Sequence, residues 1–286
     1  MASLLLSSAA WLARRLPESV KRALYRNPVL SNFIRTSLNR AAPHGMTVVE
    51  VAAGGLEGWH LELDLQAEKD YWLGTYEIGL QAAVNELVQP GAVAYDVGAN
   101  IGYISLLLAR RVGPQGQVFA FEALPENLER LRRNVALNPG AQVVQAVAVA
   151  VVDNSGPVQF LIGSSGSIGK AKGSAGRGSI SYPDSVLVSG VSLDQFVYQQ
   201  SNPEPQVIKM DIEGGEVLAL TGMVRLLQEA RPVILLELHG PEAARTAWTT
   251  LVGAGYQVCR MQPGFPAVSS LDALDWKAYV VALPAI

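Results

Sequence analysis

Residues 93–105, which read VAYDVGANIGYIS, constrain the fold more than any other stretch of the chain. An apolar run ends in Asp96, two glycines follow at Gly98 and Gly102, and an apolar helical pattern then begins. This order predicts a buried strand, a tight loop and the N-terminus of a helix. Because glycine has no side chain, such a loop lets backbone N–H groups approach a bound ligand closely.

A second acidic residue ends the next predicted strand. Residues 117–122 read QVFAFE, so Glu122 follows Asp96 at roughly the spacing of a ribose-binding carboxylate. Acids at the ends of two parallel strands suit a nucleoside-like ligand that lies across the carboxyl edge of the sheet. The loop has a Gly-x-x-x-Gly pattern rather than the G-x-G-x-x-G of dinucleotide-binding loops, which favours S-adenosylmethionine over NAD.

The composition fits an α/β enzyme with an N-terminal extension. Of the 286 residues, 49% are hydrophobic and 16% are charged, which is enough apolar material to bury a core. The formal net charge of −3 gives no basic footprint for nucleic acid. The single cysteine, Cys259, lies in a strand-like segment and predicts a buried structural thiol, and the three histidines form no Cys/His cluster of the zinc-binding kind.

Residues 1–45 differ from the rest and predict a helical arm, which leaves residues 46–286 as the main domain. Apolar and basic residues interleave in the arm, whose single acid is Glu18. A secretory signal has basic residues before its apolar run, and none precede the apolar start of this arm. The apolar run is also too short to span a bilayer. The arm either packs on the domain or offers a basic amphipathic surface to anionic lipid. We therefore expect a cytoplasmic protein, peripheral to a membrane in the second case.

From residue 46 onward strand and helix patterns alternate, which predicts a doubly wound α/β sheet. The Val-rich residues 141–152 predict a central buried strand. Residues 163–181 are almost entirely Gly and Ser with three basic residues, and predict either a loose surface loop or a lid that orders over the acceptor.

Residues 207–216, which read VIKMDIEGGE, form the second stretch that carries chemistry. A buried strand ends in Asp211, at the sheet edge where folds of this class place their sites. Glu213 and Glu216 follow before a helix, where acids are favourable on dipole grounds alone. A helix cap therefore explains Glu213 and Glu216 as well as a functional role does.

A further core strand, residues 232–238, carries Glu237, and His239 follows it. The carboxyl ends of parallel strands meet at one edge of a sheet, so these side chains are expected beside Asp211. Three carboxylates and one imidazole therefore converge on that edge.

The chain resembles the FkbM family of class I S-adenosylmethionine-dependent methyltransferases over roughly residues 46–260. The matching motifs, in chain order, are Gly74-Thr75-Tyr76-Glu77, Asp96 to Ser105, Glu122-Ala123-x-Pro125, Ser192-Leu193-Asp194 and Ile208 to Glu216. The resemblance implies a Rossmann-like sheet of seven strands, mostly parallel with the last strand antiparallel, flanked by helices. It also implies methyl transfer to hydroxyl oxygens of sugars, glycans or small metabolites.

The same resemblance assigns a set of residues to the cofactor: Tyr76, Glu77, Asp96, Gly98, Asn100, Gly102, Glu122, Ala123, Ala148 and Asp211. The backbone of the glycine loop would hold the methionine part, with Asp96 near its amino group or a water bound there. Glu122 would accept hydrogen bonds from the ribose hydroxyls, and the two alanines would line the adenine. Tyr76 and Glu77 would close the far side, with Asp211 opposite the sulfonium.

The methyl group of a sulfonium is already electrophilic, so the protein mainly has to align donor and acceptor. A hydroxyl acceptor also needs a base that takes its proton. The candidates are Asp211, Glu213, Glu237 and His239. Asp211 with Glu213 is preferred, and His239 comes second because imidazole titrates near neutral pH. Alternatively, two carboxylates hold a divalent magnesium ion that lowers the pKa of the acceptor.

Three other functions are weighed against this one. An NAD(P)-dependent oxidoreductase needs a third loop glycine and usually a Tyr-x-x-x-Lys pair, which the sequence lacks. A non-catalytic protein of the same fold would bind the cofactor without methyl transfer. A nucleic-acid methyltransferase usually carries an Asn-Pro-Pro-Tyr-like motif, which is absent. The sequence leaves open the identity of the acceptor and the oligomeric state.

Overall fold

A computed structural model describes residues 44–164, 168–176, 181–274 and 279–285, together with Arg15, Thr36 and Ala42. Nearly all of the predicted helical arm, residues 1–45, lies outside the described residues, so its packing and lipid contact stay predictions. The chain divides into two units, residues 1–78 and 79–286. No helix in the described part of the chain is long and apolar enough to cross a membrane.

The first unit contains a two-stranded antiparallel sheet. Strand β1 (Met46–Glu50) pairs with β2 (His60–Asp64), as the alternation of apolar residues predicts. A short helix, α4 (Lys69–Trp72), follows. The backbone of Gly74 then passes so close to Ala53 that a Cβ on this glycine would overlap the Ala53 carbonyl.

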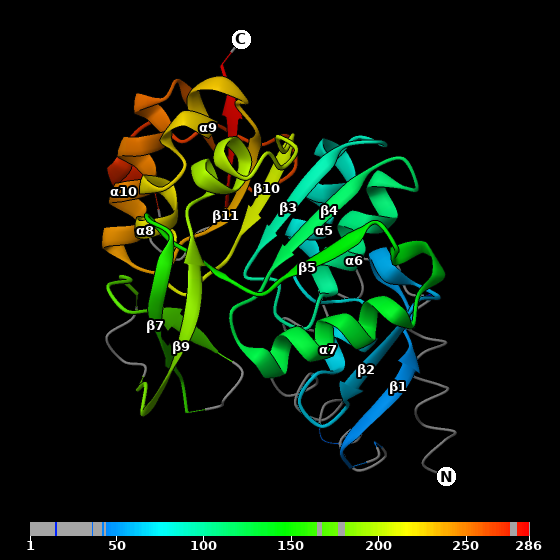
Figure 1. Ribbon diagram of the computed structural model, residues 1–286. Coiled ribbons are helices and arrows are strands. Elements are labelled where there is room, and N and C mark those ends of the chain that lie inside the picture. The colour runs from blue at the N-terminus through cyan, green and yellow to red at the C-terminus, as the bar shows by residue number, and fades with distance from the viewer. Residues whose placement is uncertain are drawn as a thin grey trace. The chain divides into compact units, whose positions relative to one another are not determined.

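The second unit is built on a seven-stranded sheet with the order β12-β13-β11-β10-β3-β4-β5 (Figure 1). All neighbours are parallel except β13, which runs antiparallel to both β11 and β12. The strands are β3 (Val93–Val97), β4 (Gln117–Phe121), β5 (Val144–Val147), β10 (Val207–Met210), β11 (Val233–Glu237), β12 (Tyr256–Arg260) and β13 (Tyr279–Pro284). The predicted α/β sheet with an antiparallel last strand is confirmed.

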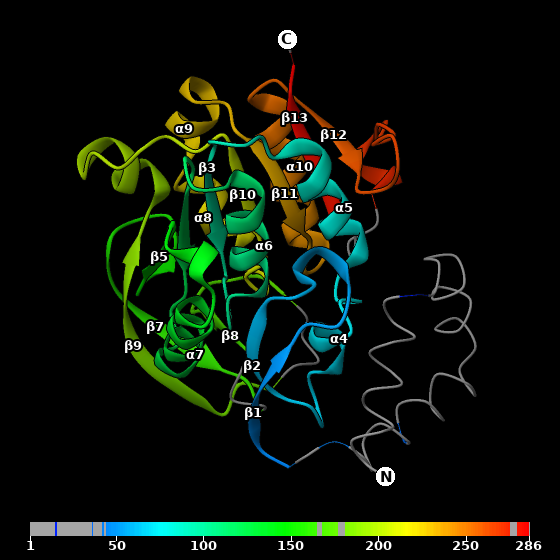
Figure 2. The ribbon, with the colours of Figure 1, turned by 90° about the vertical axis from the view of Figure 1, so that its right-hand side faces the viewer.

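Helices flank this sheet (Figures 1 and 2). They are α5 (Ile78–Leu87), α6 (Tyr103–Val112), α7 (Pro125–Ala136), α8 (Glu216–Thr221), α9 (Val224–Glu229) and α10 (Pro241–Gly253). The crossovers from β3 through α6 to β4 and from β4 through α7 to β5 place the ends of these strands at one edge.

An aromatic cluster packs on one face of β3 and β4. The rings of Tyr95, Phe119, Phe121 and Phe196 are buried and contact one another edge to face, with centroids 5.0–5.7 Å apart. The Tyr95 hydroxyl donates a hydrogen bond of 2.6 Å to the Pro203 carbonyl. These contacts tie β3 and β4 to the segment between β9 and β10.

The prediction of a central strand over residues 141–152 is wrong in two respects. Strand β5 is the edge strand of the sheet, and its residues are only partly buried or exposed. The chain then leaves the sheet at Ala148, and β6 (Ala150–Val151) joins a second sheet. The valine-rich segment contributes one strand to each of two sheets, which its apolar composition alone could not show.

The second sheet has the order β6-β9-β7-β8 and contains β7 (Gly156–Ile162), β8 (Gly169–Ala171) and β9 (Asp184–Val191). The Gly/Ser segment was predicted as loop or lid throughout, but β8 lies within it and pairs antiparallel with β7. Residues 165–167 and 177–180 of the segment lie outside the described residues. Beyond β8, a Cβ on Gly214 would overlap the Ala175 carbonyl, so this segment packs against the loop after β10.

Candidate active site

The loop between β3 and α6 has the backbone that the sequence predicts. Gly98, Asn100 and Gly102 all have positive φ values, of 78°, 50° and 91°. A Cβ on Gly98 would overlap the backbone oxygen of Asp211, and one on Gly102 would press on Leu131. Glycine is therefore required at both positions, since both conformation and space exclude a side chain.

Glu122 joins the end of β4 to this loop. Its Oε2 atom accepts a hydrogen bond of 2.8 Å from the backbone N–H of Asn100, and Oε1 accepts one of 2.8 Å from Leu124. Burial raises the pKa of Glu122, while the two N–H donors act against that shift. The Asn127 side chain also donates a hydrogen bond to this carboxylate, which leaves it lone-pair capacity for one further donor.

Asp96 is fully buried and pairs with a lysine that the sequence analysis did not single out. Its Oδ2 accepts a hydrogen bond of 2.6 Å from Ser105, and its Oδ1 lies 3.1 Å from Lys209 Nζ. Lys209 faces Asp96 across the β3–β10 pairing and also donates to the Gly98 carbonyl at 2.9 Å. Asp96 thus acts on the loop through Lys209, and its predicted place near the cofactor's amino group stays a prediction.

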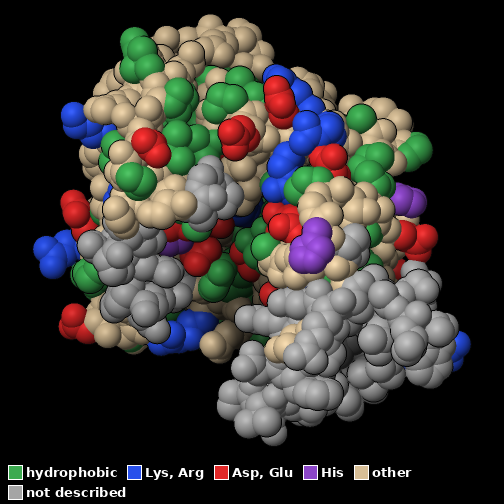
Figure 3. Space-filling view, turned by 90° about the horizontal axis from the view of Figure 1, so that it is seen from below, with side chains coloured by type: hydrophobic (Ala, Val, Ile, Leu, Met, Phe, Trp, Pro, Cys, Tyr) green, Lys and Arg blue, Asp and Glu red, His purple; other side chains and the backbone are tan. Residues whose placement is uncertain are grey.

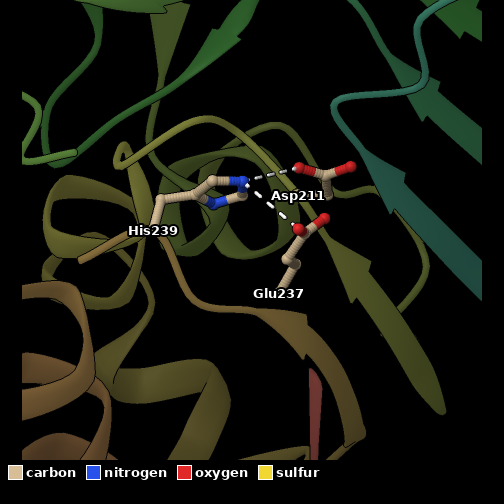
Figure 4. Close-up of side chains that lie close together, drawn as sticks. All are labelled: Asp211, Glu237 and His239. Carbon is tan, nitrogen blue, oxygen red and sulfur yellow. Dashed lines mark ion pairs between the residues drawn. The ribbon is translucent and has the colours of Figure 1, made fainter. Parts of the chain in front are cut away.

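The predicted convergence of carboxylates and an imidazole is confirmed (Figure 4). His239 Nε2 lies 3.6 Å from Asp211 Oδ1, 3.6 Å from Glu237 Oε1 and 3.7 Å from Glu213 Oε2. The histidine is 2% exposed, whereas the three carboxylate side chains keep between 16% and 26% of their surface. Figure 3 views the molecule from this edge of the sheet, with acidic side chains in red.

Glu216 also belongs to this group, although the sequence explained it as a helix cap. It is fully buried, and its Oε1 lies 3.0 Å from His239 Nδ1. The same oxygen accepts the backbone N–H groups of Ile212 and Gly214, at 3.2 and 3.3 Å. Glu216 therefore holds both the imidazole and the loop that carries Glu213. Gly214 and Gly215 precede Glu216 and let this loop fold back. This glycine pair is the sequence signal for the contact between Glu216 and the loop.

The carboxylates determine the charge of His239. Burial lowers its pKa, but the hydrogen bond and charge of Glu216, with the charges of Asp211 and Glu237, outweigh that effect and raise the pKa to about 9. In this arrangement the ring carries a proton at neutral pH and cannot accept another. The proton of an acceptor hydroxyl is therefore better taken by a carboxylate, which disfavours His239 as the base.

The remaining predicted residues lie at the edges of the site or in the other unit. Ala123 is partly buried directly after Glu122, and Ala148 is exposed where the chain leaves β5. Tyr76 stacks on Tyr71, with ring centroids 4.4 Å apart, and Glu77 has a φ of 44°. Both belong to residues 1–78, so their closure of the cofactor site stays a prediction.

Residues 96–261 match the family described as "Methyltransferase FkbM domain", a range that covers more than half of the chain and every side chain of the acid and imidazole group. The chain belongs to the FkbM methyltransferase family. It is an S-adenosylmethionine-dependent methyltransferase, and the predicted family, enzyme class and cofactor are confirmed.

The chain is similar to several individual proteins. The hexuronic acid methyltransferase AglP of Haloferax volcanii is 27% identical over 187 residues, which cover 64% of this chain and 72% of AglP. The solved methyltransferase FkbM of Methylobacillus flagellatus has a TM-score of 0.43 and 18% identity, with 76% of this chain and 53% of that chain covered. Fibrillarin of Aeropyrum pernix, solved with S-adenosyl-L-methionine, has a TM-score of 0.41 and 11% identity. The match covers 71% of this chain and 72% of the fibrillarin chain.

Proposed function

We propose that this FkbM methyltransferase transfers the methyl group of S-adenosylmethionine to a hydroxyl oxygen of a sugar, with a hexuronic acid as the acceptor to test first. The observation that carries the proposal is the close packing of Gly98 against the Asp211 backbone. It sets the cofactor loop directly beside the acids that end β10 and β11. The name of AglP supports the choice of acceptor.

The residues present fit the cofactor. The loop between β3 and α6 contains two glycines with positive φ values, Gly98 and Gly102. Because these positions carry no Cβ, the loop backbone is left accessible to a ligand. Asn100 Oδ1 is enclosed and has no hydrogen-bond partner in the part of the chain that the structure describes, so it can accept one from a ligand. Glu122 keeps lone-pair capacity for a ligand hydroxyl beside its bonds from Asn100, Leu124 and Asn127. When bound, the cofactor supplies an electrophilic methyl group.

The chain's own task in the reaction is to orient the acceptor and take its proton. Asp211 and Glu213 are partly exposed carboxylates, so an acceptor hydroxyl can reach either of them. The imidazole of His239 lies behind both carboxylates, with Nε2 3.6 Å from Asp211 and 3.7 Å from Glu213. As the methyl moves to the acceptor oxygen, one of these carboxylates receives the hydroxyl proton.

The proposal is tested with labelled S-adenosylmethionine and a matched pair of acceptors, a glucuronoside and the corresponding glucoside. We expect labelled methyl to appear in the glucuronoside, at an ether position by mass spectrometry. Binding of S-adenosylhomocysteine without transfer to any sugar in a broader screen would favour the non-catalytic alternative. Transfer to a non-sugar hydroxyl alone would overturn the choice of acceptor class.

A variant of Glu122 tests the cofactor side of the site. Glu122→Gln removes a charged acceptor from the ribose and from one backbone N–H, and is expected to weaken S-adenosylhomocysteine binding by about 10- to 100-fold. Isothermal calorimetry measures the change. Glu126→Gln is the matched control, because Glu126 is exposed at the start of α7. Equal affinities of the two variants would show that Glu122 does not hold the cofactor.

A further inference from the structure

The contacts of His239 Nε2 are unusual for a buried imidazole nitrogen. Three carboxylate oxygens surround it, yet each lies 3.6 or 3.7 Å away, beyond the 2.7–3.2 Å of an N–H···O hydrogen bond. The side chain is nevertheless only 2% exposed, so these three carboxylates are the acidic groups that face Nε2. The carboxylates are therefore arranged around a point in front of Nε2 rather than on the nitrogen itself.

The two separations from Nε2 to Asp211 and Glu237 are those of neighbouring ligands around a cation. One donor atom each from Asp211, Glu237 and His239 lies within 4.8 Å of the others. With metal–ligand bonds of about 2.0–2.2 Å, neighbouring donors of a tetrahedral or octahedral site are roughly 3.0–3.6 Å apart. The Nε2 distances to Asp211 and Glu237 lie at the upper end of that range.

A second and independent observation concerns the other side of the imidazole. Nδ1 lies 3.0 Å from Glu216 Oε1, and Glu216 is fully buried with its Oε2 unpartnered in the described part of the chain. A carboxylate that holds one ring nitrogen of a histidine fixes the ring so that the other nitrogen points at a metal. Glu216 is fully buried and cannot reach a methyl acceptor, so its contacts leave it two roles, which are orienting His239 and holding the loop after β10.

We propose that Asp211, Glu237 and His239 bind a divalent transition-metal cation, which displaces the proton that Nε2 of His239 carries in its absence, with Glu216 as the residue that positions His239. Mixed imidazole and carboxylate donors favour Mn²⁺ or Zn²⁺ over Ca²⁺. The consequence for catalysis rests on the proposed function: Asp211 holds the cation against the acceptor oxygen, whose pKa falls. Glu213, whose carboxylate lies beside this set, then receives the proton.

The experiment uses the full chain, dialysed against a chelator and then against metal-free buffer. Calorimetric titrations with MnCl₂, ZnCl₂, MgCl₂ and CaCl₂ are expected to give one site per chain, tightest for Mn²⁺ or Zn²⁺. Glu237→Gln, which changes a ligand, and Glu216→Gln, which changes the carboxylate that holds His239 Nδ1 and the loop after β10, are each expected to weaken metal binding at least 10-fold. Glu242→Gln, exposed at the start of α10, is the control and should bind as the parent does.

Circular dichroism and S-adenosylhomocysteine binding establish that each variant is folded, and Asp211→Asn replaces any that is not. The metal inference is overturned if the folded parent binds none of the four cations, or if ligand variants bind as tightly as Glu242→Gln. Full methyl transfer after chelation, without metal binding, would overturn it and leave the proposed function intact. Metal binding without transfer to any acceptor would support the metal site and remove the proposed function.

Discussion

Asp211→Asn is expected to lower kcat about 100- to 10,000-fold, the range typical of losing a group that takes part in proton transfer. The substitution keeps the size of the side chain and removes its charge. Asp211 is one of the two carboxylates that can take the acceptor's proton and also a ligand of the proposed cation, and both roles need a carboxylate. Its backbone, which packs on Gly98, is unchanged, so S-adenosylhomocysteine affinity should change little.

The experiment therefore separates rate from cofactor binding. Initial rates with saturating labelled donor give kcat, and calorimetry gives the affinity for S-adenosylhomocysteine. Glu242→Gln removes an acid that is close in sequence but exposed outside the group, and should keep the parent's kcat. A kcat for Asp211→Asn within a few-fold of this control would contradict the assignment. A parallel loss of cofactor affinity would instead place Asp211 in cofactor binding.

The position of the site was predictable because it depends on strand ends. Asp211 and Glu237 each end a predicted parallel strand, and topology brings such ends to one edge whatever the helices do. The glycine loop was predictable for a similar reason, since its backbone needs positive φ values. Features fixed by chain direction and backbone conformation are thus visible in the sequence.

The roles of Glu216 and Lys209 were not predictable in the same way. Glu216 lies 23 residues from His239, and their contact exists only because the loop after β10 folds back on the start of α8. An acid at a helix start already has a local explanation, so nothing in the sequence called for a second one. Lys209 lies inside an apolar strand, and its partner Asp96 is identified only by the pairing of β10 with β3.

Lys209→Met is expected to lower the free energy of unfolding by about 3–5 kcal/mol, the usual cost of breaking a buried ion pair from one side. Lys209 is 4% exposed and Asp96 is fully buried, so the substitution leaves a carboxylate without its counter-charge inside the sheet. Ser105 still donates to that carboxylate but carries no charge. Chemical denaturation followed by circular dichroism measures the loss.

The double variant Asp96→Asn with Lys209→Met is the informative control, because it removes both charges together. Its stability should recover most of what the single variant loses, since no unpaired charge stays buried. Its affinity for S-adenosylhomocysteine should not recover, because the hydrogen bond from Lys209 to the Gly98 carbonyl is still missing. If both stability and S-adenosylhomocysteine affinity recover, the role of Lys209 is only to balance the charge of Asp96. Recovery of stability alone would show that one buried lysine holds the cofactor loop to the strand that carries Asp211.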